Sequence, residues 1–238
     1  MFLYGKNSVL ERVKNNPKSI KRIIVQDNFD DSRITEAIKL SKLPFERVAE
    51  NKLLRIKRAD RLQGIIAEVD EFKYVDFNDL LSEAKENNKT LILLDSLNDP
   101  HNLGTIIRTL ACFGDFAVVI PKHESCEINE TVLHVASGAE NFIPVSIVTN
   151  LSTSLIAAKK EGFWAVGAVV DGGSDINNTE LTFPLCLVLG SEGKGIRPGL
   201  EKQLELKVKI PMAGASLSFN VAMACSIFAY EINRQKKR

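Results

Sequence analysis

Apolar residues from position 90 onward gather in short runs without alternation, separated by amphipathic stretches. The runs cover residues 91–95, 116–120, 143–148, 164–170, 185–190 and 206–210. Such runs are typical of strands buried on both faces of a parallel sheet. Strands that alternate with helices predict an open α/β sheet with right-handed crossovers. We therefore expect a parallel α/β domain over 90–238.

The first 75 residues predict a smaller α/β unit. Helices are expected around 9–13 and over 31–42, and strands over 20–26, 45–48 and 64–69. About 75 residues are enough for a viable core. A polar, helical stretch follows at 76–89, and we place the linker between the two domains there.

The balance of charged residues limits the ways in which the chain could bind nucleic acid. The 238 residues carry 31 Lys and Arg against 30 Asp and Glu, so the chain is no polycation, and any contact with nucleic acid must be local. The first domain contains two basic clusters, one within residues 52–61 and one within residues 1–25. A solvated surface is the plain alternative, but two clusters favour contact with a phosphate backbone. The candidate RNA-binding residues are Lys52, Arg55, Lys57, Arg58 and Arg61.

Four cysteines lie far apart without a CxxC pair, and there are only three histidines. This pattern predicts reduced thiols in a cytoplasmic protein and no metal site. The uncharged stretch 210–230 is long enough to span a bilayer, but Pro211, Gly214 and Asn220 predict a loop and a helix start buried in protein. The N-terminus has no secretory pattern.

The first candidate motif follows the strand that ends at Asp95. Asp99-Pro100 predicts a helix start, and apolar residues at helical spacing predict one core face for that helix. Arg108 lies off this face, one turn beyond Gly104, and Asn102 precedes both. Ligands of open sheets bind beyond the carboxyl ends of strands, so Asn102 and Arg108 are candidate site residues rather than plain surface groups.

A second motif begins where the strand over 185–189 runs into Gly-Ser-Glu-Gly-Lys-Gly. This loop lacks both the GxxxxGK[ST] phosphate-loop frame and GxGxxG. Glu192 would repel a polyphosphate, so the loop suits a ligand held by backbone groups. A tight turn rich in glycine is the alternative.

The third motif is the uncharged loop that precedes the last helix. Ser218 or Asn220 is expected to cap that helix. The helix has two apolar stripes and is therefore expected to be buried on two sides, one of them against a second copy of the chain. The stripes are Val221, Ala224, Cys225, Phe228, Ala229 and Ile232, and Phe219, Met223, Ile227 and Tyr230.

Taken in order, the three motifs resemble those of the SpoU (TrmH) family of SPOUT-class RNA 2′-O-ribose methyltransferases. Asn-x-Gly-x-x-x-Arg is matched by 102–108, Gly-Ser-Glu-Gly-x-Gly by 190–195, and Ile-Pro-Met with Ser-Leu-Asn-Val by 210–212 and 218–221. Residues 136–140 also look familial. The stretches 4–11 and 63–67 resemble the family's ribosomal-protein-like substrate-binding domain. Leu62 departs from a frequent His, and Phe219 departs from the usual Leu.

The resemblance implies a trefoil-knotted parallel sheet, S-adenosylmethionine bound within the knot, and a homodimer formed through the C-terminal domain. It implies methyl transfer to a ribose 2′-hydroxyl of RNA, with ribosomal RNA and guanosine favoured. The implied cofactor-binding residues are Leu189, Gly190, Gly195, Ile210, Met212 and Phe219. The implied catalytic residues are Asn102, Arg108, Glu192, Ser218 and Asn220.

Three alternatives stay open at this point. The target RNA could be a transfer RNA, the chain could be a noncatalytic RNA-binding protein on the same fold, or the glycine loop could serve a nucleotide-dependent enzyme. Because an arginine is protonated at physiological pH, we expect Arg108 to position the hydroxyl and its phosphate rather than to remove a proton.

Overall fold

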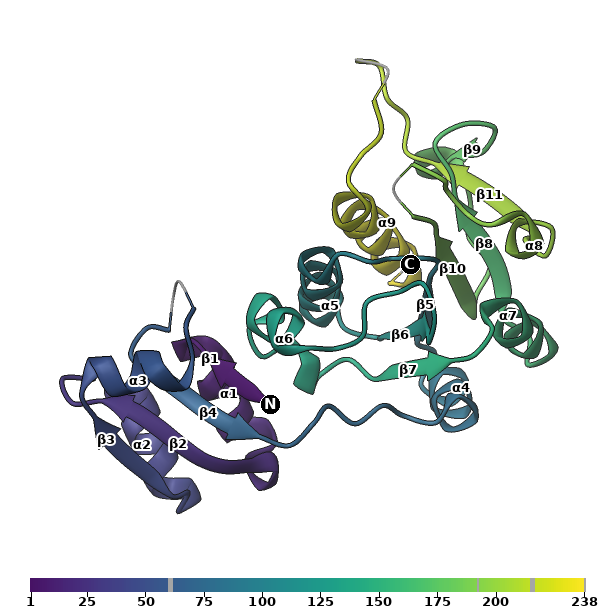
Figure 1. Ribbon diagram of the computed structural model, residues 1–238. Helices are drawn as coiled ribbons and strands as arrows, with labels where there is room; N and C mark the ends of the chain where they lie inside the picture. The colour runs from purple at the N-terminus through teal and green to yellow at the C-terminus, as the bar shows by residue number, and fades with distance from the viewer. Residues whose placement is uncertain (60–61, 192, 215–216, 238) are drawn as a thin grey trace. The chain divides into compact units, whose positions relative to one another are not determined.

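The computed structural model describes residues 1–59, 62–191, 193–214 and 217–237, and it divides the chain into two compact units (Figure 1). Unit 1 consists of Met1–Lys73 and Ile128–Phe142. Unit 2 consists of Tyr74–Glu127 and the chain from Ile143 onward. Residues 128–142, which the sequence analysis places with the second domain, therefore pack with unit 1.

Unit 1 is built on a four-stranded sheet in the order β1-β4-β2-β3, in which only β2 and β3 pair in parallel. The expected strands and helices are present, whereas β1 and α3 were not expected. The three residues of β1 are too few to show alternation. The elements are β1 (Phe2–Tyr4), α1 (Lys6–Asn15), a 3₁₀ turn (Pro17–Ser19), β2 (Ile20–Gln26), α2 (Ser32–Ser41), β3 (Phe45–Val48), α3 (Glu50–Ile56), β4 (Ile65–Val69), α6 (Glu130–Ala136) and a 3₁₀ turn (Ala139–Asn141).

A buried ion pair joins α1 to the turn after α6. The Arg12 guanidinium donates to Glu140 Oε1 at 2.9 Å, and both side chains are almost fully buried. Burial raises the pKa of the Glu140 carboxyl, and Arg12 opposes that rise. Close packing leaves no space beside Gly138, where an added Cβ would lie 2.4 Å from Glu11 Cβ. The segment 128–142 is thus part of the core of unit 1.

Unit 2 contains a seven-stranded sheet in the order β7-β6-β5-β10-β8-β11-β9, and all of its pairs are parallel. Each of the six apolar runs forms a strand, as the sequence predicts. β9 has two residues, too few to leave a pattern. The strands are β5 (Thr90–Leu94), β6 (Phe116–Pro121), β7 (Val145–Val148), β8 (Trp164–Ala168), β9 (Ser174–Asp175), β10 (Leu185–Leu189) and β11 (Leu206–Lys209).

Helices cover both faces of this sheet (Figure 1). Buried residues of α4, α7 and α8 share one core with alternate residues of the strands, while α5 and α9 pack together. Asp99 caps α5, which begins at Pro100 as expected. The helices are α4 (Phe77–Glu86), α5 (Pro100–Phe113), α7 (Leu151–Lys160), α8 (Pro198–Glu201) and α9 (Val221–Lys236), with a 3₁₀ turn at Ile176–Asn178.

The stretch 76–89 is helical, as expected, but it is not a free connection. It forms α4, whose residues Leu80, Leu81 and Ala84 are buried in the core of unit 2. Three apolar residues at helical spacing are enough to hold a short polar helix against a sheet. The predicted linker is therefore part of the core of unit 2.

The last helix buries one of its two apolar stripes. Val221, Cys225 and Phe228 face the core, whereas Met223 and Tyr230 on the other stripe are exposed in the single chain. The homodimer and the trefoil knot stay predictions. Within the described residues, no helix combines the length and apolarity needed to cross a membrane.

Removing one partner of the Arg12–Glu140 pair is expected to destabilise unit 1. Glu140→Ala leaves a buried guanidinium without its counter-charge, at a cost of about 3–5 kcal/mol. Amide hydrogen exchange of β2 and β4 in the full chain measures the loss. Arg22→Gln, which removes the exposed ion pair between Arg22 and Glu68, is the control and should cost at most about 1 kcal/mol. Equal exchange in the two variants would contradict the prediction.

Candidate functional site

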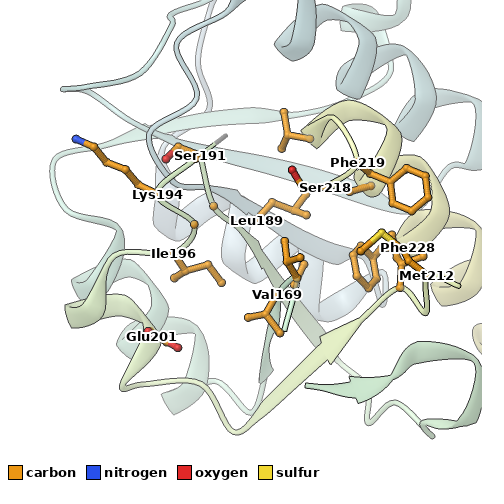
Figure 2. A pocket seen from close by; sticks show the side chains of 18 residues that line it. Val169, Leu189, Ser191, Lys194, Ile196, Glu201, Met212, Ser218, Phe219 and Phe228 are labelled. Carbon is orange, nitrogen blue, oxygen red and sulfur yellow. The ribbon is translucent and has the colours of Figure 1, made fainter. Parts of the chain in front are cut away.

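A cavity of about 450 Å³ lies beyond the carboxyl ends of β8 and β10 (Figure 2). Among the described residues, five stretches of chain line it: the end of β8 and the residues after it, the end of β10 with the glycine-rich loop, the last residue of α8, the loop after β11 and the first turns of α9. The size falls in the range of small-molecule and cofactor pockets, about 300–1,000 Å³. The lining residues are Ala168, Val169, Val170, Leu189, Gly190, Ser191, Gly193, Lys194, Gly195, Ile196, Glu201, Ile210, Met212, Ser218, Phe219, Val221, Ala224 and Phe228.

The cavity brings together two of the three motifs. The six residues expected to bind a cofactor all line it, and they come from the end of β10 and from the loops after β10 and β11. Parallel strands end at the same edge of a sheet, so the loops that follow β8, β10 and β11 meet there. The assignment of these six residues to a ligand stays a prediction.

The glycine-rich loop closes on itself through its backbone. Ser191 N donates to Gly195 O at 3.2 Å, and Gly195 N donates to Ser191 O at 3.0 Å. At Gly190 an added Cβ would lie 2.1 Å from the carbonyl carbon of Gly195, a distance that no side chain tolerates. Gly190 is therefore required by close approach of backbone to backbone.

Most of the side chains that line the cavity are apolar, among them Val169, Leu189, Ile196 and Phe228 (Figure 2). Ser218 also lines the cavity, and the Lys194 side chain extends away from it. A concave site with mostly apolar side chains and a few polar groups suits a small organic ligand.

A hydrogen bond between side chains joins the first motif to the third. Asn220 Nδ2 donates to Asn102 Oδ1 at 3.0 Å, and Asn220 Oδ1 accepts from Ala222 N as the cap of α9. Of the two expected capping candidates, Asn220 is the cap, while Ser218 lines the cavity. Asn102 itself is buried at the start of α5.

Arg108 is exposed on α5, off the core face, as expected. It does not line the cavity, so the structure does not bring it together with the cofactor candidates. Glu192 lies outside the described residues, as does Arg61.

The remaining RNA-binding candidates lie on or just after α3. Arg55 and Arg58 are exposed, and Lys52 approaches Glu46 at 4.0 Å. Lys57 is already engaged, because its ammonium pairs with Glu130 and lies over the ring of Tyr4. Arg55 and Arg58 are thus the members of the cluster best placed to contact a phosphate.

Sequence reasoning did not name Val169 and Val170, which line the cavity from the segment after β8. They belong to an apolar run that was interpreted as strand alone. Only the strand order, with β8 beside β10, shows that the end of β8 borders the cavity.

The described part of the chain contains no cluster of metal ligands, and two of its four cysteines are buried. No group of three or more His, Cys, Asp or Glu side chains is placed to hold a metal ion there. Burial raises the pKa of the Cys186 thiol well above its usual value and that of Cys225 to about 12. Neither buried thiol is a nucleophile near neutral pH.

Two families match the chain along most of its length. The SpoU rRNA methylase family matches residues 89–230, and the family described as RNA 2′-O ribose methyltransferase substrate binding matches 2–75. YacO of Bacillus subtilis, classed with the TrmH family of tRNA/rRNA methyltransferases, is 34% identical over 240 residues, covering 99% of this chain and 96% of the relative. A Staphylococcus aureus protein of the same class is 33% identical over 98% of this chain and 96% of its own.

Solved structures share the fold. The SpoU methyltransferase AviRb of Streptomyces viridochromogenes, in complex with AdoMet, has a TM-score of 0.82 at 20% identity and covers 100% of this chain and 90% of its own. An AdoMet-bound rRNA methyltransferase of Sinorhizobium meliloti has a TM-score of 0.80 at 22% identity and covers 98% and 86%. At these identities the likeness shows a common architecture.

Gly190→Ala is expected to open the glycine-rich loop. A Cβ there overlaps the Gly195 carbonyl, and relief of such overpacking costs about 1–3 kcal/mol. The amides of Ser191 and Gly195 should then exchange with solvent about tenfold faster or more, as measured by hydrogen exchange. Gly199→Ala, at a position with open space around it, is the matched control and should leave the loop unchanged. Unchanged exchange in Gly190→Ala would show that the close approach does not hold the loop.

Proposed function

The chain belongs to the SpoU rRNA methylase family, and from this premise we propose that it is an RNA methyltransferase that transfers a methyl group from S-adenosylmethionine to a ribose 2′-hydroxyl. The observation that carries the proposal is the cavity. Its walls are the loops of the second and third motifs, and they contain all six residues expected to bind the cofactor.

The cavity fits S-adenosylmethionine in size and chemistry. Leu189, Ile210 and Met212 supply apolar surface for an adenine, and Gly190 and Gly195 bring the backbone of the closed loop to the cavity wall. When bound, the cofactor supplies a methyl group activated by a sulfonium. A loop without side chains at its closest points lets a ligand approach the backbone directly.

The acceptor must be held in line, because a ribose hydroxyl is a weak nucleophile. We assign that task to the exposed guanidinium of Arg108, whose planar fork suits a hydroxyl and its neighbouring phosphate. Asn102 and Asn220 fix the start of α5 to the start of α9 through their hydrogen bond. Ser218 faces the cavity and is assigned to orient the reacting groups, with Glu192.

For the RNA itself we propose that residues 1–75 bind the substrate and 90–238 carry the reaction. The match of 2–75 to a substrate-binding family and the exposed Arg55 and Arg58 support this division. Ribosomal RNA is the favoured target, with guanosine as the nucleoside, and transfer RNA is the second candidate because relatives are named for both. The exposed stripe of α9, with Met223 and Tyr230, supports a homodimer through the C-terminal domain.

Arg108→Ala is expected to lower methyl transfer by about 100-fold or more and to leave cofactor binding within twofold. The guanidinium contacts the acceptor in this proposal, and loss of a positioning group costs rate rather than donor affinity. Total RNA that lacks this methylation is incubated with each protein and the cofactor, and the 2′-O-methylated nucleotides are then mapped. Calorimetry gives the Kd for the cofactor. Wild-type protein that binds no cofactor would refute the proposed function. An Arg108→Ala variant with full turnover would refute the role of Arg108.

Arg55→Gln together with Arg58→Gln is expected to weaken RNA binding at low salt and to reduce the slope of log K against log salt by about 1–2. Each exposed arginine that neutralises a phosphate releases a counterion, so its loss lowers the slope. Binding titrations over a range of salt concentrations measure it. Arg33→Gln, also exposed in unit 1 but paired with Asp31, is the control and should not change the slope. An unchanged slope in the double variant would place the RNA contact elsewhere.

A further inference from the structure

One buried residue, Asp95, contacts both ends of the glycine-rich loop, through its backbone at the entrance and through its carboxylate at the exit. Asp95 follows β5 directly, and its side chain is 0% exposed. Its backbone N donates to Leu189 O at 2.8 Å, at the residue where the loop leaves β10. Its carboxylate contacts Arg197, the residue where the loop ends. Asp95 therefore spans the entrance and the exit of the loop that lines the cavity.

The contact with Arg197 uses both carboxylate oxygens. Oδ2 accepts from Arg197 backbone N at 2.8 Å, and Oδ1 accepts from Arg197 Nε at 2.7 Å. The Nη2 atom lies 2.6 Å from Oδ1. Charge-assisted bonds of this kind are shorter and stronger than neutral ones, and they fix direction as well as distance.

The ion pair between Asp95 and Arg197 differs from the contact between Arg197 and Glu124, because the Asp95 carboxylate is buried. A buried charge is costly unless it is paired, so Asp95 stabilises the fold only when residue 197 is in place. Glu124 Oε2 accepts from Arg197 Nη1 at 3.1 Å, but its side chain is 69% exposed. An exposed pair of that kind contributes little. The exit of the loop is therefore held by Asp95.

The described residues between these two ends make no charged contact with the sheet. Ser191 and Gly195 bond to each other, which closes the loop, and Ile196 is buried in the core of unit 2. The described residues of the loop, 190–191 and 193–196, form one wall of the cavity (Figure 2). Moving either end would displace that wall.

We propose that Asp95 and Arg197 are positioning residues for the methyl donor: the buried carboxylate locks the loop in the shape that receives S-adenosylmethionine. The inference rests on the proposed function for the identity of the ligand. It assigns to Asp95 a role in donor affinity rather than in the chemistry of the acceptor, which lies with Arg108.

The test uses the full chain with Asp95→Asn, Arg197→Gln and Arg197→Lys. Asp95→Asn keeps the shape and the backbone bond to Leu189 but removes the charge. Weakening of the charge-assisted contact between Asp95 and Arg197 predicts a cofactor Kd about 10- to 100-fold higher for Asp95→Asn and Arg197→Gln, with Arg197→Lys between these and the wild type. The variant that carries both Asp95→Asn and Arg197→Gln should bind the cofactor no more weakly than the weaker-binding of the two single variants. Both changes remove the same interaction, so their effects should not add.

Glu124→Gln is the matched control, since it removes the exposed partner of the same arginine, and its Kd should stay within twofold. Amide hydrogen exchange over 190–196, measured without cofactor, is the second readout. It should rise in Asp95→Asn and Arg197→Gln while β5 and β10 keep their protection, which a general loss of stability would not produce. In turnover assays the loss should appear in the KM for the donor, with kcat little changed at saturation.

Wild-type protein that binds no cofactor would refute the proposed function, and the exchange data would still decide whether Asp95 holds the loop. Wild-type affinity and loop protection in Asp95→Asn and Arg197→Gln would overturn the inference. A Glu124→Gln variant that binds the cofactor as weakly as Arg197→Gln does would show that Asp95 is not the residue that holds Arg197 in place. If Asp95→Asn does not fold, Arg197→Gln decides alone, because its side chain is half exposed and its removal leaves the strands intact.

Discussion

The cavity exists because β10 inserts between β5 and β8, in parallel with both. Leu187 and Val188 pair with Ile92 and Leu93 of β5, residues far away in the sequence, and every residue of both strands is buried. Burial of these apolar side chains is the main favourable term in such a pairing. Because of this pairing, the loop after β10 emerges between the ends of β5 and β8. Asp95 therefore lies on one side of the loop and Val169 on the other.

The chemistry of the site follows from that placement. Backbone atoms of a loop rich in glycine form one wall, and the first turns of α9 form another. Asn102 and Asn220, joined by a hydrogen bond, and the exposed Arg108 lie on α5 and at the start of α9. In the proposed function these residues position the acceptor, so donor affinity and acceptor positioning are expected to respond to different mutations.

The sequence predicted the strands well, and the reason is physical. In a parallel sheet covered by helices, each strand must be apolar on both faces, so 91–95 or 185–190 stands out against its neighbours. Shorter elements escaped notice: β1 and β9 have too few residues for a period, and α3 is a short helix with few buried residues. The segment 76–89 was helical as expected, yet three buried side chains place it in the core of unit 2 instead of in a linker.

Local sequence determined the longer strands and helices, the helix start at Asp99-Pro100 and the three motifs, because each depends on residues a few positions apart. It left the cap of the last helix open between Ser218 and Asn220, and the structure assigns it to Asn220. Local sequence did not determine which strand ends become neighbours. The contact between Asp95 and Arg197 joins residues 102 positions apart, and the cavity wall at Val169 depends on the strand order. Only the tertiary structure decides such pairs, because their geometry is fixed by how the strands are ordered in the sheet and not by the period of any one segment.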